Sequence, residues 1–351
     1  MRRNASAVSP WGGSDPPSRD FTPYMRKSKF MTAKFTRRIT LILVCALFAY
    51  PFGSPAEEDT KKNPEIDLKR TAGYLQEWAE MRPGFPESLS FAYYYAFASM
   101  SLEKKIAPEA QKKIINYIRA CQTPDGGFVA EPGFTSEPDL VSTYFALKTL
   151  EVLNSFEAVD KKKAAQFVLS LSQEDGGMRA GPKSKYSSVM TSFYGIASLD
   201  LLGALQGLNK EKAVSYLMSF RDKDKGFGVE KGKPSRPPST FAAVHTLKIL
   251  GALNDEVKAG AVKYLKETRY AGLHLEETYT TQPTIQDMAY VLEAFADLSA
   301  GGEVNRDSIY EFIASLYIPE NGGFGPQPGY GASPPSTYYG VLCLKQLGKL
   351  N

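Results

Sequence analysis

The carboxylates Glu137 and Asp139 form the closest approach to a catalytic pair in this sequence of 351 residues. Two carboxylates at this spacing can serve as general acid and general base. Solvation in a loop, or the preference of a helix N-terminus for negative charge, explains the pair more simply. Asp287, at the start of a later predicted helix, is a third acidic candidate.

The two histidines offer little for a metal site or for nucleophilic catalysis. His245 lies among Val244, Leu247 and Ile249, so we expect a core histidine there rather than a catalytic one. His274 has two acidic neighbours, which leaves a metal site or a polar surface as the alternatives; these neighbours are Glu276 and Glu277. The body of the chain has only Cys121 and Cys343, far apart, and we expect both to be buried thiols.

A repeated turn shows which elements must position these groups. Asp125-Gly-Gly-Phe128 recurs in full or weakened form, with one glycine of each copy at residues 127, 177, 226, 272 and 323. Ahead of most turns, apolar residues follow the i, i+4, i+7 spacing of an amphipathic helix. The triplets are Ile114, Ile118, Cys121; Ala164, Val168, Leu171; Ala213, Leu217, Phe220; and Ile309, Ile313, Leu316. Thr268 breaks the pattern in the fifth repeat, so we expect a shorter helix there.

A second helix follows each turn after a loop of about ten residues, and it is apolar nearly all round, which is typical of an enclosed helix. A polar residue opens each of these helices and is predicted to be its N-cap. The column is Ser142, Thr191, Ser239, Asp287 and Ser336. Apolar helices inside and amphipathic helices outside predict an all-α toroid of six hairpins, with residues 66–110 as an irregular first hairpin. Closure of the ring is preferred over an open solenoid, because the final helix is as apolar as the internal ones.

Basic residues in the third and fourth loops would lie on the rim where the inner helices begin. Helix N-termini favour anions, so this rim is a candidate phosphate site. A solvated charged loop is the alternative interpretation. The six residues are Arg179, Lys183, Lys185, Lys231, Lys233 and Arg236.

The turn, the polar cap and runs such as Leu247-Lys-Ile-Leu-Gly251 resemble the repeat of prenyltransferases and squalene cyclases over the whole chain after its leader. The closest likeness is to the β subunit of type II protein geranylgeranyltransferase. The resemblance implies an (α/α)6 toroid whose central cavity is lined by aromatic side chains and takes an isoprenoid tail. The candidates for this lining are Phe91, Tyr94, Tyr144, Phe193, Tyr194, Phe241, Tyr290, Tyr338 and Tyr339; packing of the core is the alternative role for each.

The resemblance also implies one zinc ion, which holds the acceptor thiolate through an Asp, a Cys and a His. In this sequence the three positions fall on Thr284, Gln286 and Ser336, so we predict no zinc and no other cofactor. The family's basic residues for the diphosphate fall on Thr278 and Thr281. The Asp-x-Asp-Asp string of the cyclase branch does not occur.

Residues 1–56 differ in composition from the rest and form a separate leader. They carry a net charge of +7. Because the whole chain carries +4, residues 57–351, the predicted toroid domain, carry −3. Such a body gives no electrostatic footprint for nucleic acid. A basic stretch from Met31, an apolar run of Ile39 to Tyr50 and the small residues of Ser54-Pro-Ala56 predict a signal peptide and an exported protein. A membrane anchor and a cytoplasmic protein are the less favoured alternatives.

We therefore expect a prenyltransferase-like toroid that binds an isoprenoid or another long apolar ligand and has lost its zinc site. One alternative is an active geranylgeranyl transferase or terpene-cyclase-type enzyme with an unusual site. The other is a scaffold that binds a protein partner, since β subunits of the family pair with a helical α subunit.

Overall fold

The computed structural model describes residues 63–133, 137–267 and 283–350, and within these ranges it has twelve α-helices and no strands. They all belong to the second of the two units of the chain, Lys61–Asn351. The helices are α1 Leu68–Glu80, α2 Leu89–Glu103, α3 Pro108–Cys121, α4 Leu140–Val152, α5 Lys161–Ser170, α6 Val189–Leu201, α7 Lys210–Met218, α8 Pro237–Ile249, α9 Asp255–Glu267, α10 Ile285–Asp297, α11 Arg306–Ser315 and α12 Pro334–Gln346.

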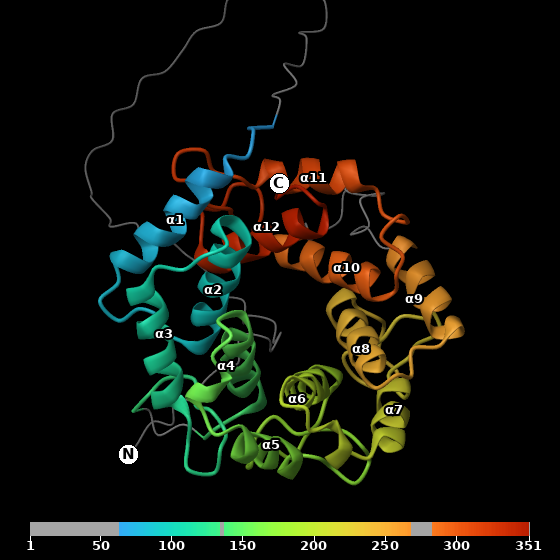
Figure 1. Cartoon of the computed structure of the whole chain (residues 1–351). Coiled ribbons are helices and arrows are strands. Elements are labelled where there is room, and N and C mark those ends of the chain that lie inside the picture. The colour runs from blue at the N-terminus through green and yellow to red at the C-terminus, as the bar shows by residue number, and fades with distance from the viewer. Residues whose placement is uncertain (1–62, 134–136, 268–282, 351) are drawn as a thin grey trace, which may run out of the picture. The chain divides into compact units, whose positions relative to one another are not determined.

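The even-numbered helices of this unit form an inner ring, and the odd-numbered helices surround it (Figure 1). Each inner helix packs against the next one along the chain, and the last, α12, packs against the first, α2. The outer helices bury one face each, for example Ile114, Ile118 and Cys121 of α3. This arrangement confirms the predicted α/α toroid of six hairpins.

A repeated glycine contact joins neighbouring hairpins and also closes the ring. Gly126 has a φ of +95° and lies so close to the backbone of Lys163 that a Cβ would come within 2.2 Å. Gly322 makes the equivalent contact with Arg70, where a Cβ would come within 2.6 Å. Because Arg70 belongs to α1 and Gly322 follows α11, the last repeat docks on the first as the internal repeats dock on one another.

The prediction that Ser142, Thr191, Ser239, Asp287 and Ser336 are the N-caps of the inner helices is wrong, because these residues lie inside the first turn of each helix. The N-caps lie three residues earlier, for example Asp139 and Ser188. In four of these five repeats the next residue is a buried Thr or Ser whose hydroxyl accepts a hydrogen bond from the backbone N–H at the end of the turn, whereas α10 has Met288 there. The pairs are Phe128 to Thr143 at 3.3 Å, Met178 to Ser192 at 3.2 Å, Phe227 to Thr240 at 3.0 Å and Phe324 to Thr337 at 3.1 Å. The second hydroxyl of the Ser-Thr signature therefore joins these four turns to their inner helices.

The expectation of a shorter outer helix in the fifth repeat is wrong. Helix α9 has 13 residues, against 10, 9 and 10 in α5, α7 and α11. It gains length at its N-terminus, where Asp255 and Glu256 complement the helix dipole. Cys121 and Cys343 are buried free thiols, as expected, and burial raises the pKa of Cys121 to about 12.

Candidate functional site

Aromatic side chains from all six inner helices form a closed circuit of ring contacts, which we call the aromatic girdle. Successive ring centroids lie 5.1–6.3 Å apart, within the range in which aromatic pairs attract. The members lie five or six residues after the N-cap of their helices. In order around the ring they are Tyr94, Phe145, Tyr194, Phe193, Phe241, Tyr290 and Tyr339.

Most of the predicted lining residues take part in the girdle or contact it. Tyr338 stacks on Tyr94 with ring centroids 4.6 Å apart, and Tyr144 contacts Phe193 and Tyr194. Phe91 differs, because it also contacts Trp78 of the outer helix α1 at 5.3 Å. The lining prediction omitted Tyr93, Phe97 and Phe145, which lie on the same helical faces.

A group of titratable side chains lies one turn or more further along the same inner helices, and we call it the polar cluster. Its members are His245 and Lys248 of α8, Glu293 and Asp297 of α10, Lys148 of α4 and Lys345 of α12. The imidazole of His245 adjoins the girdle, with its centroid 5.5 Å from those of Phe193 and Phe241. The cluster and the girdle therefore form one continuous inner surface.

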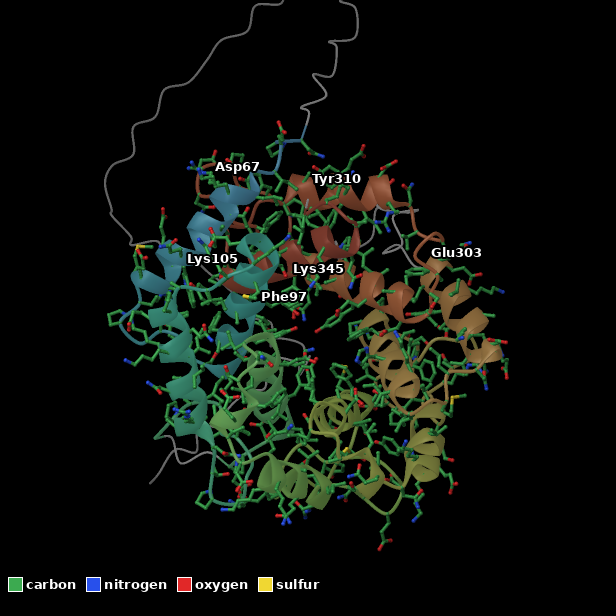
Figure 2. All side chains as sticks on the ribbon, in the orientation of Figure 1. Asp67, Phe97, Lys105, Glu303, Tyr310 and Lys345 are labelled. Atoms are coloured by element: carbon green, nitrogen blue, oxygen red, sulfur yellow. The ribbon has the colours of Figure 1, made fainter. Side chains whose placement is uncertain are left out.

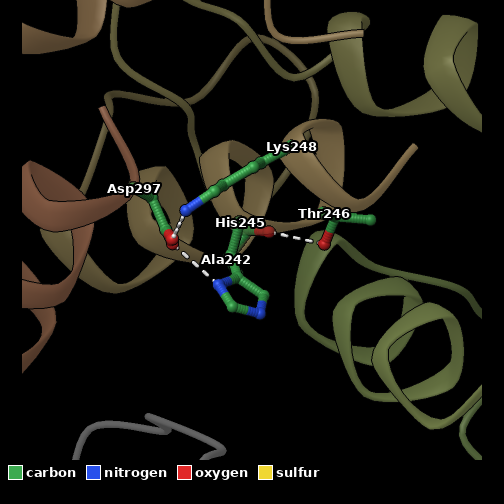
Figure 3. A network of polar contacts seen from close by, with 5 residues as sticks. All are labelled: Ala242, His245, Thr246, Lys248 and Asp297. Atoms are coloured by element: carbon green, nitrogen blue, oxygen red, sulfur yellow. Dashed lines mark hydrogen bonds and ion pairs between the residues drawn. The ribbon is translucent and has the colours of Figure 1, made fainter. Parts of the chain in front are cut away.

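Asp297 binds two side chains of the neighbouring helix (Figure 3). Its carboxylate lies 2.7 Å from Nδ1 of His245 and 2.9 Å from Nζ of Lys248. Burial alone would raise the pKa of Asp297, but the hydrogen bonds and charges of His245 and Lys248 outweigh it and hold this pKa below its usual range. The bond fixes the orientation of the imidazole, and Nε2 is directed away from the carboxylate (Figure 3).

Glu293 interacts electrostatically with side chains of several inner helices. Burial raises its pKa to about 7, while His245, Lys148 and Lys345 act to lower it and Asp297 acts to raise it. The charge of Glu293 in turn acts on tyrosines of four inner helices, namely Tyr93, Tyr144, Tyr290 and Tyr338. A carboxyl group with this pKa exchanges its proton near neutrality and can donate or accept a hydrogen bond.

The remaining lysines of the cluster are engaged by neighbouring groups. Lys148 forms an ion pair with Glu151 at 2.5 Å. The ammonium of Lys345 lies 4.8 Å from the ring centroid of Phe97, and both side chains extend toward the middle of the ring (Figure 2). Both contacts tie a positive charge to the inner surface.

The repeat register could have revealed the polar cluster from the sequence. Nine residues after each N-cap, the inner helices carry Phe97, Lys148, Ala197, His245, Glu293 and Leu342. Three titratable residues at one position of enclosed helices are costly to bury without a partner. The hydrophobicity of α8 alone predicts a core histidine at His245, whereas this register position links it to Lys148 and Glu293.

The predicted acidic candidates serve as caps or ion-pair partners in the structure. Asp139 is the N-cap of α4 and accepts hydrogen bonds from the backbone and hydroxyl of Ser142, both at 2.8 Å. Asp287 completes a capping box with Thr284 at the start of α10. Glu137 forms an ion pair with Lys183. None of these contacts brings the three carboxylates together, so their catalytic role stays a prediction.

The three positions that correspond to zinc ligands in the family hold other contacts here. Thr284 caps α10, and the amide of Gln286 donates to the hydroxyl of Tyr290 at 3.2 Å. Ser336 pairs with Ser333 at the start of α12, with 2.8 Å between their hydroxyl oxygens. Neutral hydroxyl and amide groups do not fit zinc, which takes thiolate, imidazole or carboxylate ligands. In the part of the chain that the structure describes, no three His, Cys, Asp or Glu side chains cluster so as to hold a metal ion.

The predicted anion rim is dispersed in its contacts. Arg179 donates toward the carbonyl of Ser170 at 3.4 Å, and Lys183 pairs with Glu137. Lys231 lies 4.9 Å from the ring centroid of Tyr216 on the outer helix α7. Lys185, Lys233 and Arg236 are exposed. Three of the six residues therefore contact other groups and do not converge on a common anion site.

Some predictions concern residues outside the described ranges. These include the signal peptide, the His274 site with Glu276 and Glu277, and the positions Thr278 and Thr281. Among the helices that the structure describes, none is both long and apolar enough to cross a bilayer.

Comparisons with known proteins agree on the fold. A family model for the prenyltransferase alpha-alpha toroid domain matches residues 68–274 and 258–351. Curated proteins give no match to the sequence. Among solved structures, protein geranylgeranyltransferase-I of Candida albicans, in complex with GGPP, has a TM-score of 0.68 at 15% identity and covers 81% of this chain and 92% of its own.

Terpene cyclases and a further protein also share the fold. A type II terpene cyclase from Scytonema has a TM-score of 0.55 at 14% identity and covers 80% of this chain and 98% of its own. A variant of that cyclase in complex with geranylgeranyl dihydroxybenzoate has a TM-score of 0.56 at 12% identity, with 81% and 97% covered. A protein from Actinoplanes has a TM-score of 0.57 at 14% identity, with 80% and 100% covered.

Proposed function

The chain belongs to the prenyltransferase alpha-alpha toroid family, and from this premise we propose that it binds an isoprenoid or similarly long apolar ligand inside its inner ring. The aromatic girdle carries the proposal. Seven aromatic rings from six helices meet in one circuit, with centroids at most 6.3 Å apart. Such a surface offers apolar contact in all directions around a chain.

Partial exposure of inward side chains supports a ligand rather than a closed core. Tyr144 and Phe97 are only partly buried although they contact girdle residues or their neighbours. The side chain of His245 is 33% exposed beside Phe193 and Phe241. Apolar surface that stays accessible inside a ring of helices gains free energy when an apolar ligand covers it.

The ligands of two structural neighbours are consistent with this choice. The Candida albicans enzyme was solved with GGPP and the Scytonema cyclase variant with geranylgeranyl dihydroxybenzoate. Both ligands carry a prenyl chain of the kind proposed here. We further propose that zinc-dependent transfer is lost, because Thr284, Gln286 and Ser336 provide none of the groups that activate a thiol. A closer relationship to the β subunit of type II protein geranylgeranyltransferase than to other family members stays a prediction.

Native mass spectrometry of the full chain, purified from its own host, tests the proposal together with metal analysis of the same sample. We expect a bound isoprenoid mass and no stoichiometric zinc. Stoichiometric zinc would contradict the loss of the transfer site. Release of a processed product from added geranylgeranyl substrate would favour the enzyme alternative, and co-purification of a protein with an empty ring would favour the scaffold.

A matched pair of variants locates the ligand. Tyr144→Leu removes a partly buried ring of the inner surface. We expect it to lower retention of the isoprenoid by about tenfold, because contacts between one aromatic ring and an apolar ligand contribute on the order of 1–2 kcal/mol. Tyr186→Leu is the control, since Tyr186 is 83% exposed on a loop. Equal retention in the two variants would place the ligand outside the girdle.

A further inference from the structure

We propose that the polar cluster is the head-group half of this ligand site, and that it takes an uncharged, hydrogen-bonding end group such as an alcohol or a quinone carbonyl in preference to a diphosphate. The inference rests on the proposed function, because it assumes that the apolar chain lies along the girdle. It adds the chemical class of the ligand.

The position of the cluster makes it the polar end of the girdle. His245 follows Phe241 by one turn of α8, and its imidazole contacts Phe193 and Phe241 with centroids 5.5 Å apart. Glu293 follows Tyr290 on α10 and acts electrostatically on Tyr144 and Tyr338 across the ring. A chain in contact with the girdle therefore ends beside an imidazole and a carboxyl group.

The hydrogen-bonding groups of the cluster suit a neutral partner. Asp297 holds Nδ1 of His245 at 2.7 Å and leaves Nε2 directed away from it (Figure 3). The side chain of His245 is 33% exposed, so Nε2 is within reach of a ligand. The Glu293 carboxyl and this imidazole offer one donor and one acceptor between them, which match a hydroxyl or a carbonyl oxygen.

The charges of the cluster oppose a diphosphate. Each lysine already has a partner on the inner surface: Lys148 has Glu151, Lys248 has Asp297, and Lys345 has the ring of Phe97. Glu151, beside the cluster, pairs with Lys148 and Asp297 pairs with Lys248, and Glu293, when ionised, adds a third negative charge that Lys148 and Lys345 act on. A diphosphate would bring several further negative charges next to Glu293 and Asp297, where partial burial strengthens repulsion.

The basic loops do not supply the missing anion site. Arg179, Lys183 and Lys231 are directed to Ser170, Glu137 and Tyr216. The remaining basic groups of that rim lie near the N-terminal ends of the inner helices, whereas the polar cluster lies toward their C-terminal ends. A head group in the cluster is therefore separated from them by the girdle.

Three probes with the same C20 carbon skeleton test the inference on the full-length protein: the saturated hydrocarbon phytane, geranylgeraniol and geranylgeranyl diphosphate. We expect geranylgeraniol to bind at least tenfold more tightly than the diphosphate and about threefold to tenfold more tightly than the hydrocarbon, measured by quenching of intrinsic fluorescence at pH 7. If no probe binds, the proposed function fails. If all bind equally, or the diphosphate binds most tightly, only the head-group inference fails.

Two variants assign the preference to named atoms. His245→Leu removes the imidazole, and we expect it to weaken geranylgeraniol by about tenfold and to leave phytane unchanged. Glu293→Gln removes the negative charge, so we expect the preference for geranylgeraniol over the diphosphate to fall by at least threefold. Glu174→Gln, in an exposed turn, is the matched control, and thermal melting checks that each variant folds. Unchanged discrimination in both cluster variants would overturn the assignment.

Discussion

The aromatic girdle and the polar cluster lie about one helical turn apart on the same inner helices, yet they relate differently to the repeat. All six inner helices contribute a ring to the girdle. One turn later the same register position carries titratable side chains in only three helices, at Lys148, His245 and Glu293. Repetition therefore builds the apolar surface, and departure from repetition builds the polar one. The polar surface is where a specific function of this chain is expected.

Removal of a girdle ring should have the largest effect on stability. Phe241 is 4% exposed and contacts Phe193, His245 and Tyr290. Phe241→Ala should lower the free energy of unfolding by about 3–5 kcal/mol, because a buried aromatic is lost and a cavity is left. Urea denaturation followed by circular dichroism measures the change.

The exposed Tyr186 provides the reference for that measurement. Tyr186→Ala should change the free energy of unfolding by no more than about 0.5 kcal/mol. A cost below about 1 kcal/mol for Phe241→Ala would show that the girdle does not hold the inner ring together. The girdle would then contribute no more to the stability of the ring than an ordinary surface residue does.

Neutralisation of Glu293 should raise the free energy of unfolding, by an intermediate amount that depends on pH. Its pKa is about 7 in the folded protein against 4.5 for the free group. Below pH 4.5 the carboxyl is protonated in both the folded and the unfolded chain, so wild type carries no penalty. Between pH 4.5 and 7 the unfolded chain ionises first, and the stability of wild type falls relative to Glu293→Gln; above pH 7 the difference is constant.

The expected size follows from the shift in pKa. A shift of this size corresponds to at most about 3 kcal/mol of extra stability for Glu293→Gln at pH 8, and partial exposure of the side chain reduces it. Thermal unfolding of both proteins from pH 4 to pH 8 measures the difference. A difference that does not grow with pH would contradict the raised pKa and the buried setting of the cluster.

The ring could be predicted from the sequence because each repeat carries the same turn and the same two helix patterns. The Asp-Gly-Gly-Phe turn needs a positive φ at Gly126, Gly176 and Gly322, where any Cβ would meet the next outer helix. The apolar inner helices and the amphipathic outer helices follow from the period of their side chains. The predicted N-cap column lies three residues too late, because polar side chains at that position bond to the true N-cap residue, as Ser142 does to Asp139 and Ser336 to Ser333.

The repeat register marks three positions of the polar cluster, but its contacts could not be predicted from the sequence, because they join different repeats. His245 and Asp297 are 52 residues apart, and their bond joins α8 to α10. The raised pKa of Glu293 depends on burial by the whole inner ring, with charges from α4, α8 and α12 around it. Residue types alone therefore suggested a core histidine, whereas the closed ring places His245 between the girdle and Asp297.

Neutralisation of the basic rim should have the smallest effect on ligand affinity. Lys183, Lys185 and Lys233 are exposed, and only Lys183 among them has a described ion pair, with Glu137. Exposed pairs contribute about 0–1 kcal/mol. The triple change of these lysines to Gln should therefore leave the affinity for geranylgeraniol within twofold of wild type, as measured by the same fluorescence titration at 0.15 M salt. A tenfold loss would move the head group from the polar cluster to the rim, since a distant solvated charge acts little through the girdle at that ionic strength.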